Sequence, residues 1–128
     1  MLTQTARADI VIIVNPDSPL AELNQQNVSD LYLGRTRAIH GAERFLILDQ
    51  PRDSDLRSRF FAQLNGMSLR SVNAYWARLQ FSGDSQPPIP LSDSKSVVET
   101  VRHNRLAIGY IDAAAVTNDV RPILTLRK

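Results

Sequence analysis

Cysteine is absent from this chain, and histidine and tryptophan are scarce, with two copies and one copy in 128 residues. Without cysteine the protein forms no disulfide, has no thiol nucleophile and offers no thiolate to a metal. The two histidines, His40 and His103, are far apart and form no short-spaced ligand pair, so no metal site is expected. Long apolar runs are also lacking, and none approaches the roughly 20 residues that a membrane-spanning helix needs.

The chain also lacks a strong charge of either sign and the common catalytic motifs. Fifteen basic and 13 acidic residues leave a formal net charge of +2, which does not favour a nucleic-acid partner. There is no glycine-rich phosphate loop and no G-x-S-x-G motif. We therefore expect no enzymatic activity and no cofactor. The apolar fraction of 43% is sufficient for one folded domain of this length.

Residues 1–8 differ from the rest of the chain. Ala6 and Ala8 flank Arg7 just before Asp9, and this A-x-A pattern is the one that signal peptidase cleaves. The pattern predicts that residues 1–8 are the remnant of an export signal and that residues 9–128 form a single periplasmic domain. A plain disordered tail is the alternative interpretation of the same residues.

The remaining sequence alternates between strand and helix patterns. The apolar, β-branched run Ile10–Val14 is typical of a strand buried on both faces, as in a parallel sheet. Further strands are predicted at residues 45–48, 89–91, 107–111 and 120–126. Helices are predicted to begin at Asn24, at Asp53 or Ser54, at Ser68, and at Asp93 or Ser94. This order predicts an α/β fold with a mainly parallel sheet flanked by helices.

The stretch between the strand at 45–48 and the following helix is the most informative part of the chain. A strand that leads into a helix N-terminus presents free backbone N–H groups to an anion, and Arg52 and Arg57 could add bidentate donors. Ordinary capping is the competing interpretation, in which Asp53 or Ser54 satisfies those N–H groups and Asp55 supplies a carboxylate. From these residues alone, capping is better supported than anion binding.

Several segments occur together in an order that is typical of one protein family. They are IVIIVNP at 10–16, VSDLYLG at 28–34, the turn at Ser54, GMS at 66–68, YWAR at 75–78, FSG at 81–83 and AIGYID at 107–112. With this order, the chain resembles the periplasmic phosphate-binding component of bacterial phosphate ABC transporters. The resemblance covers about residues 9 to 125. It implies a type II periplasmic-binding-protein fold, an exported protein and phosphate bound at a helix N-terminus.

The resemblance also implies which residues contact the ligand. The predicted binding residues are Ser54, Asp55, Leu56, Arg57, Arg52 and Ser18. Ser54 is expected to donate through its hydroxyl and N–H, Asp55 and Leu56 through backbone N–H alone, and Arg57 to supply charge. Ser18, near the exit of the first strand, is the weaker candidate. The family motif has an arginine where Gln50 stands, and Gly-Thr where Asp55 and Leu56 stand.

The expected partners follow from the same resemblance. They are a small anion, with phosphate suspected, and a membrane transporter or sensor protein. The length corresponds to about one lobe of the full-length relatives, so a second copy of the chain is a further expected partner. The alternative function is a protein-interaction module that keeps the fold and has lost the anion site, and the acidic side chains of Asp53 and Asp55 motivate it.

Overall fold

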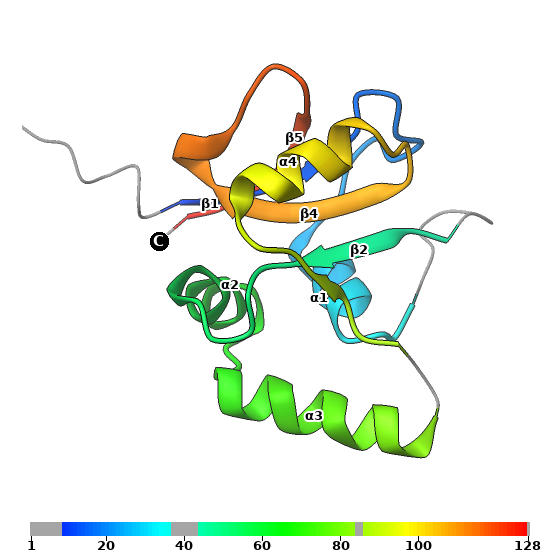
Figure 1. Ribbon diagram of the computed structural model, residues 1–128, viewed down its shortest axis with the longest axis vertical. Coiled ribbons are helices and arrows are strands. Elements are labelled where there is room, and N and C mark those ends of the chain that lie inside the picture. Colours follow the sequence, from blue (N-terminus) through cyan, green and yellow to red (C-terminus); the bar gives the residue numbers. More distant parts are fainter. Residues whose placement is uncertain (1–8, 37–43, 84–85, 128) are drawn as a thin grey trace, which may run out of the picture.

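The computed structural model describes residues 9–36, 44–83 and 86–127, which form one sheet with helices on both sides (Figure 1). The export pattern at Ala6–Ala8 and the loop with His40 lie outside the described residues. The strands are β1 Ile10–Val14, β2 Leu46–Asp49, β3 Ile89–Pro90, β4 Ala107–Asp112 and β5 Arg121–Leu126. The helices are α1 Gln25–Tyr32, α2 Asp55–Asn65, α3 Leu69–Ser82 and α4 Ser94–Arg102, with a short 3-10 helix at Ala113–Ala115. Within these ranges, no helix is both long and apolar enough to cross a membrane.

The sheet has the strand order β3-β2-β4-β1-β5. β2 pairs in parallel with β3 and β4, whereas β1 is antiparallel to both β4 and β5. Four of the five described strands therefore point the same way, and β1 runs against them. This confirms the predicted α/β class with a flanked, mainly parallel sheet.

The direction of β1 differs from the sequence-based prediction. Its five residues are all buried, as the apolar run predicts, but both of its neighbours are antiparallel rather than parallel. A continuous apolar run shows that both faces of a strand are covered, and it carries no information about strand direction.

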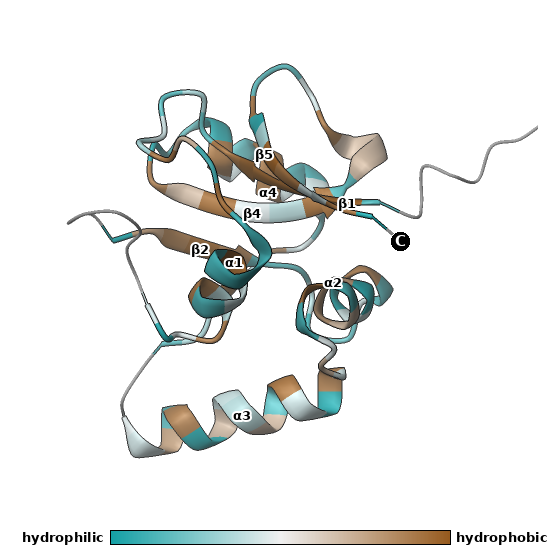
Figure 2. Ribbon diagram, turned by 180° about the vertical axis from the view of Figure 1, so that it is seen from behind, coloured by the Kyte–Doolittle hydropathy of each residue, from teal (hydrophilic) through white to brown (hydrophobic). Residues whose placement is uncertain are grey.

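The two faces of β1 belong to two separate apolar layers. Ile10, Ile12 and Val14 pack with residues of α1, α2 and α3, whereas Val11 and Ile13 pack with residues of α4. In Figure 1, α4 lies in front of the sheet and α1 behind it, and Figure 2 shows the reverse arrangement from the other side. The alternation of side chains along a strand explains this division.

The helix starts agree with the predicted capping residues. Asn24, Ser54, Ser68 and Asp93 each accept a hydrogen bond from a backbone N–H in the first turn of the helix that they precede. Caps of this kind satisfy N–H groups that have no partner inside the helix. Ser18 lies in the turn that leaves β1, where its hydroxyl oxygen accepts from the Leu20 N–H.

α3 is attached to the rest of the protein through two aromatic side chains. The indole N–H of Trp76 donates to the carbonyl of Tyr32 at 3.1 Å, and the hydroxyl of Tyr75 donates to the carbonyl of Leu33. Both carbonyls belong to the C-terminal end of α1, where helical carbonyls lack internal partners. These contacts hold α3 opposite the end of β2 and therefore form one side of the site described next.

Candidate functional site

The carboxyl end of β2 carries a buried carboxylate, Asp49, which is 4% exposed. Its Oδ1 accepts from the hydroxyl of Tyr110 and from the N–H of Gln50, and its Oδ2 accepts from Arg57 Nε at 3.0 Å. Buried charges need such partners, because an unpaired carboxylate in the interior is strongly disfavoured. Asp49 is thus fully engaged in internal contacts.

Arg57 reaches this carboxylate from the first turns of α2. Its Nη1 donates to the carbonyl of Arg52 and to Asn73 Oδ1, both at 2.9 Å, and its guanidinium carbon lies 5.4 Å from the centroid of the Phe61 ring. The Nη2 group makes no hydrogen bond with any of the described residues. Arg57 therefore has one remaining donor group after it neutralises Asp49.

Two tyrosines border the same carboxylate. Burial, and then the nearby Asp49 carboxylate, raises the pKa of the Tyr110 hydroxyl well above its usual range. The same two causes raise the pKa of Tyr32, whose hydroxyl donates to the carbonyl of Leu48 at 2.6 Å. Both hydroxyls therefore remain protonated donors in the folded protein, and they fix the end of β2.

The N-terminal turn of α2 has the geometry of a capped helix start. Ser54 lies in an extended conformation, with φ −72° and ψ 149°, and its Oγ accepts from the Arg57 N–H at 3.2 Å. The carboxylate of Asp55 accepts from Arg59 Nε at 2.9 Å, along the helix and not at its tip. Among the described residues, no hydrogen-bond acceptor is found for the backbone N–H of Asp55 or Leu56.

The structure brings together five of the six predicted binding residues and separates the sixth. Arg52 through Arg57 follow the carboxyl end of β2, whereas Ser18 follows Val14, which pairs with Ile108 near the beginning of β4. β2 and β4 are parallel, so Ser18 and Ser54 lie beyond opposite ends of the sheet. The antiparallel direction of β1 causes this separation.

Within the group that is brought together, the side chains face in different directions. Arg57 is 6% exposed and turns inward, and Leu56 is partly buried against the apolar layer beneath α2. Arg52 is exposed, and its guanidinium makes no ion pair with the described residues. Arg52 is therefore the available cation of this turn.

A pocket of about 240 Å³ opens beside the turn, between α2, α3 and the segment that leads into β3. Its buried lining residues are Asp49, Gln50, Arg57, Trp76 and Pro88. Its exposed lining residues are Arg52, Ala77, Gln80 and Pro90. The pocket thus combines a buried floor, partly apolar and partly polar, with a rim that carries a free arginine.

Sequence-based reasoning missed this pocket. The residues that α3 contributes, Asn73, Trp76, Ala77 and Gln80, are spaced by three, one and three positions and so share one helix face. A shared helix face does not indicate whether it packs in the core or lines a pocket, and Trp76 does both, since it is 5% exposed. In the part of the chain that the structure describes, no cluster of three or more His, Asp or Glu side chains could hold a metal ion.

Comparison with solved structures defines the fold. An ABC-type phosphate transport receptor from Vibrio cholerae superposes with a TM-score of 0.70 at 18% identity, over 96% of this chain and 52% of the other. The chain has the fold of periplasmic substrate-binding proteins. A structure described as a phosphate ABC transporter substrate-binding protein from Clostridium perfringens, with bound phosphate, gives a TM-score of 0.71 at 17% identity. This second match covers 91% of this chain and 45% of the other.

The periplasmic-binding-protein fold is present here as about one lobe. The chain spans about half the length of the solved structures that it matches, and PstS from Borrelia burgdorferi gives the same result, with 47% covered at a TM-score of 0.53 and 12% identity. No protein-family model and no curated protein sequence matches the chain. At these identities the similarity defines the architecture, and the chemistry of the site depends on the residues of this chain.

Proposed function

We propose that this protein binds a small oxyanion, with phosphate as the first candidate, at the N-terminal turn of α2. One observation carries the proposal: the N–H groups of Asp55 and Leu56 have no acceptor among the described residues. The Ser54 hydroxyl oxygen accepts from the Arg57 N–H instead, and the Asp55 carboxylate pairs with Arg59. Free N–H groups at a helix start, together with the helix dipole, favour an anion. Ser54 adds a hydroxyl, and Arg52 adds an unpaired positive charge next to the turn.

The fold comparison supports the choice of phosphate. The Clostridium perfringens structure of the same fold contains bound phosphate. In open α/β sheets, ligands bind beyond the carboxyl ends of the strands, which is where the α2 turn lies in this chain. Gln50 supplies no charge there, because its side-chain amide is neutral, and this amide donates inward to Ser94 Oγ and to the carbonyl of Tyr110. In this proposal Arg52 supplies the positive charge that the arginine of the family motif would supply at the position of Gln50.

The proposal extends to location and partner. An exported protein with this fold would deliver its anion to a membrane transporter of the ABC class, the class named for the Vibrio cholerae and Clostridium perfringens proteins. N-terminal sequencing of the protein recovered from its native compartment tests the export prediction. Recovery of a chain that retains residues 1–8 would contradict cleavage after Ala8.

The direct test compares two substitutions of one residue by titration calorimetry with phosphate. Asp55→Ala removes the carboxylate and keeps the N–H, so it should bind phosphate more tightly than the parent protein. Asp55→Pro removes the carboxylate and the N–H. Proline is tolerated at the first helical position, and the extended Ser54 is compatible with a following proline. The proline variant should bind about tenfold more weakly than the alanine variant.

A matched pair of serine variants controls for loss of the helix cap. Ser54→Ala and Ser68→Ala each remove a hydroxyl oxygen that caps a helix through one N–H. Both should lower the free energy of unfolding by about 0.5–2 kcal/mol, and only Ser54→Ala should weaken phosphate binding. Equal affinities for the two serine variants would remove Ser54 from the site. Absence of heat and of a thermal shift for the parent protein at about 10 mM phosphate would reject the site itself.

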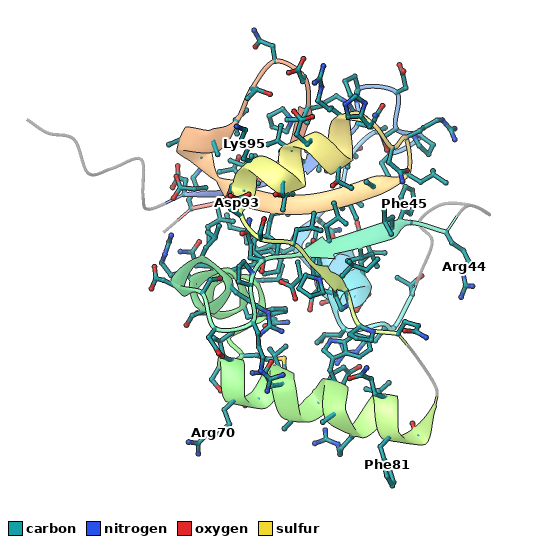
Figure 3. The ribbon with its side chains drawn as sticks, viewed as in Figure 1. Arg44, Phe45, Arg70, Phe81, Asp93 and Lys95 are labelled. Atoms are coloured by element: carbon teal, nitrogen blue, oxygen red, sulfur yellow. The ribbon has the colours of Figure 1, made fainter. Side chains whose placement is uncertain are left out.

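One observation bears on the alternative, a protein-interaction module. Phe81 is 95% exposed and points away from the protein at the end of α3 (Figure 3), and Ile89 is 46% exposed. Interaction surfaces are contiguous apolar patches of several hundred Å², and scattered exposed residues are common on monomeric proteins. Two such residues therefore do not support a second proposal.

A further inference from the structure

The pocket between α2 and α3 has properties that a bare inorganic anion does not use. Trp76, Ala77 and Pro88 give it an apolar wall, which an oxyanion surrounded by water would leave uncovered. Its volume of about 240 Å³ exceeds the roughly 150 Å³ of a cavity that binds benzene. The pocket therefore has room for a ring-sized apolar group together with a small polar group.

The hydrogen-bonding groups that remain in the pocket are mostly donors. The Asp49 carboxylate is satisfied by Tyr110, Gln50 and Arg57, whereas Arg57 Nη2 and the side-chain N–H₂ of Asn73 make no hydrogen bond with the described residues. Asp49 and Arg57 cancel each other's charge, which leaves the guanidinium of Arg52 as the net charge of the pocket. Unpaired donors and one net positive charge favour a ligand that has a carboxylate.

We infer that this pocket is a second binding site, selective for a small organic carboxylate with an apolar body. The carboxylate receives hydrogen bonds from Arg57 Nη2 and Asn73, and the apolar body lies against Trp76 and Pro88. Arg57 is suited to this role because its side chain is 8% exposed and is held in place at Nε and Nη1, so little conformational freedom is lost on binding. The pocket is distinct from the proposed phosphate turn, since Ser54, Asp55 and Leu56 do not line it, and Arg52 borders both.

Three probes separate the parts of the inference. Benzoate combines the carboxylate with a ring, benzamide keeps the ring and loses the charge, and acetate keeps the carboxylate and loses the ring. Two-dimensional NMR titration of the labelled protein should show saturable shifts of Trp76 and Asn73 side-chain signals with benzoate. Benzamide and acetate should each bind at least about tenfold more weakly. Absence of benzoate shifts at these signals, or equal affinity for benzamide, would overturn the inference.

A variant of the rim residue Ala77 tests the location. Ala77→Trp fills the pocket from an exposed position on α3, so the fold should tolerate it. It should weaken benzoate at least about tenfold and leave phosphate affinity unchanged. Arg78→Trp, at the exposed neighbouring position outside the pocket, is the matched control and should leave benzoate affinity unchanged.

The outcomes distinguish the two sites. Loss of benzoate binding in Ala77→Trp with phosphate binding retained supports the pocket whether or not the phosphate turn has the proposed role. Unchanged benzoate affinity in the folded Ala77→Trp variant overturns the pocket. Loss of both benzoate and phosphate affinity in this variant would show that the two ligands share one site, and would overturn the proposal of a second site.

Discussion

Replacement of Arg57 by methionine should destabilise this protein more than replacement of any exposed arginine. The substitution keeps a side chain of similar length and removes the charge that Asp49 needs, since Asp49 is 4% and Arg57 6% exposed. Removal of one partner from a buried ion pair costs about 3–5 kcal/mol, because the remaining charge stays buried without compensation. Domains of this size have a total stability of about 5–15 kcal/mol, so the loss is a large fraction of it.

Urea unfolding followed by fluorescence measures this loss. Trp76 is the single tryptophan of the chain and lies 5% exposed in the core, so its emission reports on global unfolding. With a slope of about 2 kcal/mol per M, a loss of about 4 kcal/mol lowers the unfolding midpoint by about 2 M. The slope itself should stay constant, since the native structure buries the same surface in both proteins.

Arg35→Met is the matched control for this experiment. Arg35 pairs with Asp30 at 3.5 Å, but its side chain is 57% exposed, so its removal should cost less than about 1 kcal/mol. Addition of Asp49→Asn to Arg57→Met removes the buried charge that the single variant leaves behind. The double variant should therefore lose at least about 1 kcal/mol less than the sum of the single losses. A single-variant loss as small as that of Arg35→Met, or additive losses, would refute the role assigned to the pair.

Three further outcomes are expected. Gly109→Ala should lower the free energy of unfolding by about 1–3 kcal/mol, because a Cβ at this position would lie 2.5 Å from a methyl group of Val97 in α4. An unchanged midpoint of unfolding in urea would contradict this close contact. Because folding raises the pKa of Tyr32 and Tyr110, the stability that they contribute is present below about pH 10 and lost as the pH rises above it. Tyrosinate absorbance should show that both side chains ionise only as the protein unfolds. Folding lowers the pKa of Asp93 through hydrogen bonds in the first turn of α4. The contribution of Asp93 to stability is therefore present above about pH 4 and is lost as the pH falls through the folded pKa. Asp93→Asn keeps the cap and should remove this part of the acid sensitivity, which thermal unfolding at several pH values measures.

The sequence predicted the secondary structure well because the signals for it are local. One polar residue directly before a helical pattern of apolar residues is enough to predict a cap. Ser54, Ser68 and Asp93 all cap the helices predicted for them. Proline favours an edge strand because it cannot donate to a neighbouring strand, and β5, which contains Pro122, is an edge of the sheet. The segment order also indicated the periplasmic-binding-protein fold, because that order is a property of the chain and not of its packing.

The site was predicted in part. Ser54 caps α2 as expected, and the N–H groups of Asp55 and Leu56 lie where an anion would need them, although binding there stays a prediction. The role of Arg57 could not be predicted, because its partner Asp49 is eight positions earlier and belongs to another element. Asn73, which completes the contacts of Arg57, is sixteen positions later, on a third element.

The sequence by itself determined where the strands lie, where the helices begin and which residues cap them. These features depend on the geometry of four or five successive residues. Only the tertiary structure decided the direction of β1, and with it the separation of Ser18 from Ser54, because strand direction depends on which segments pair across the sheet. It also decided that Arg57 turns inward and Arg52 outward, since burial depends on neighbours that the chain supplies from distant positions.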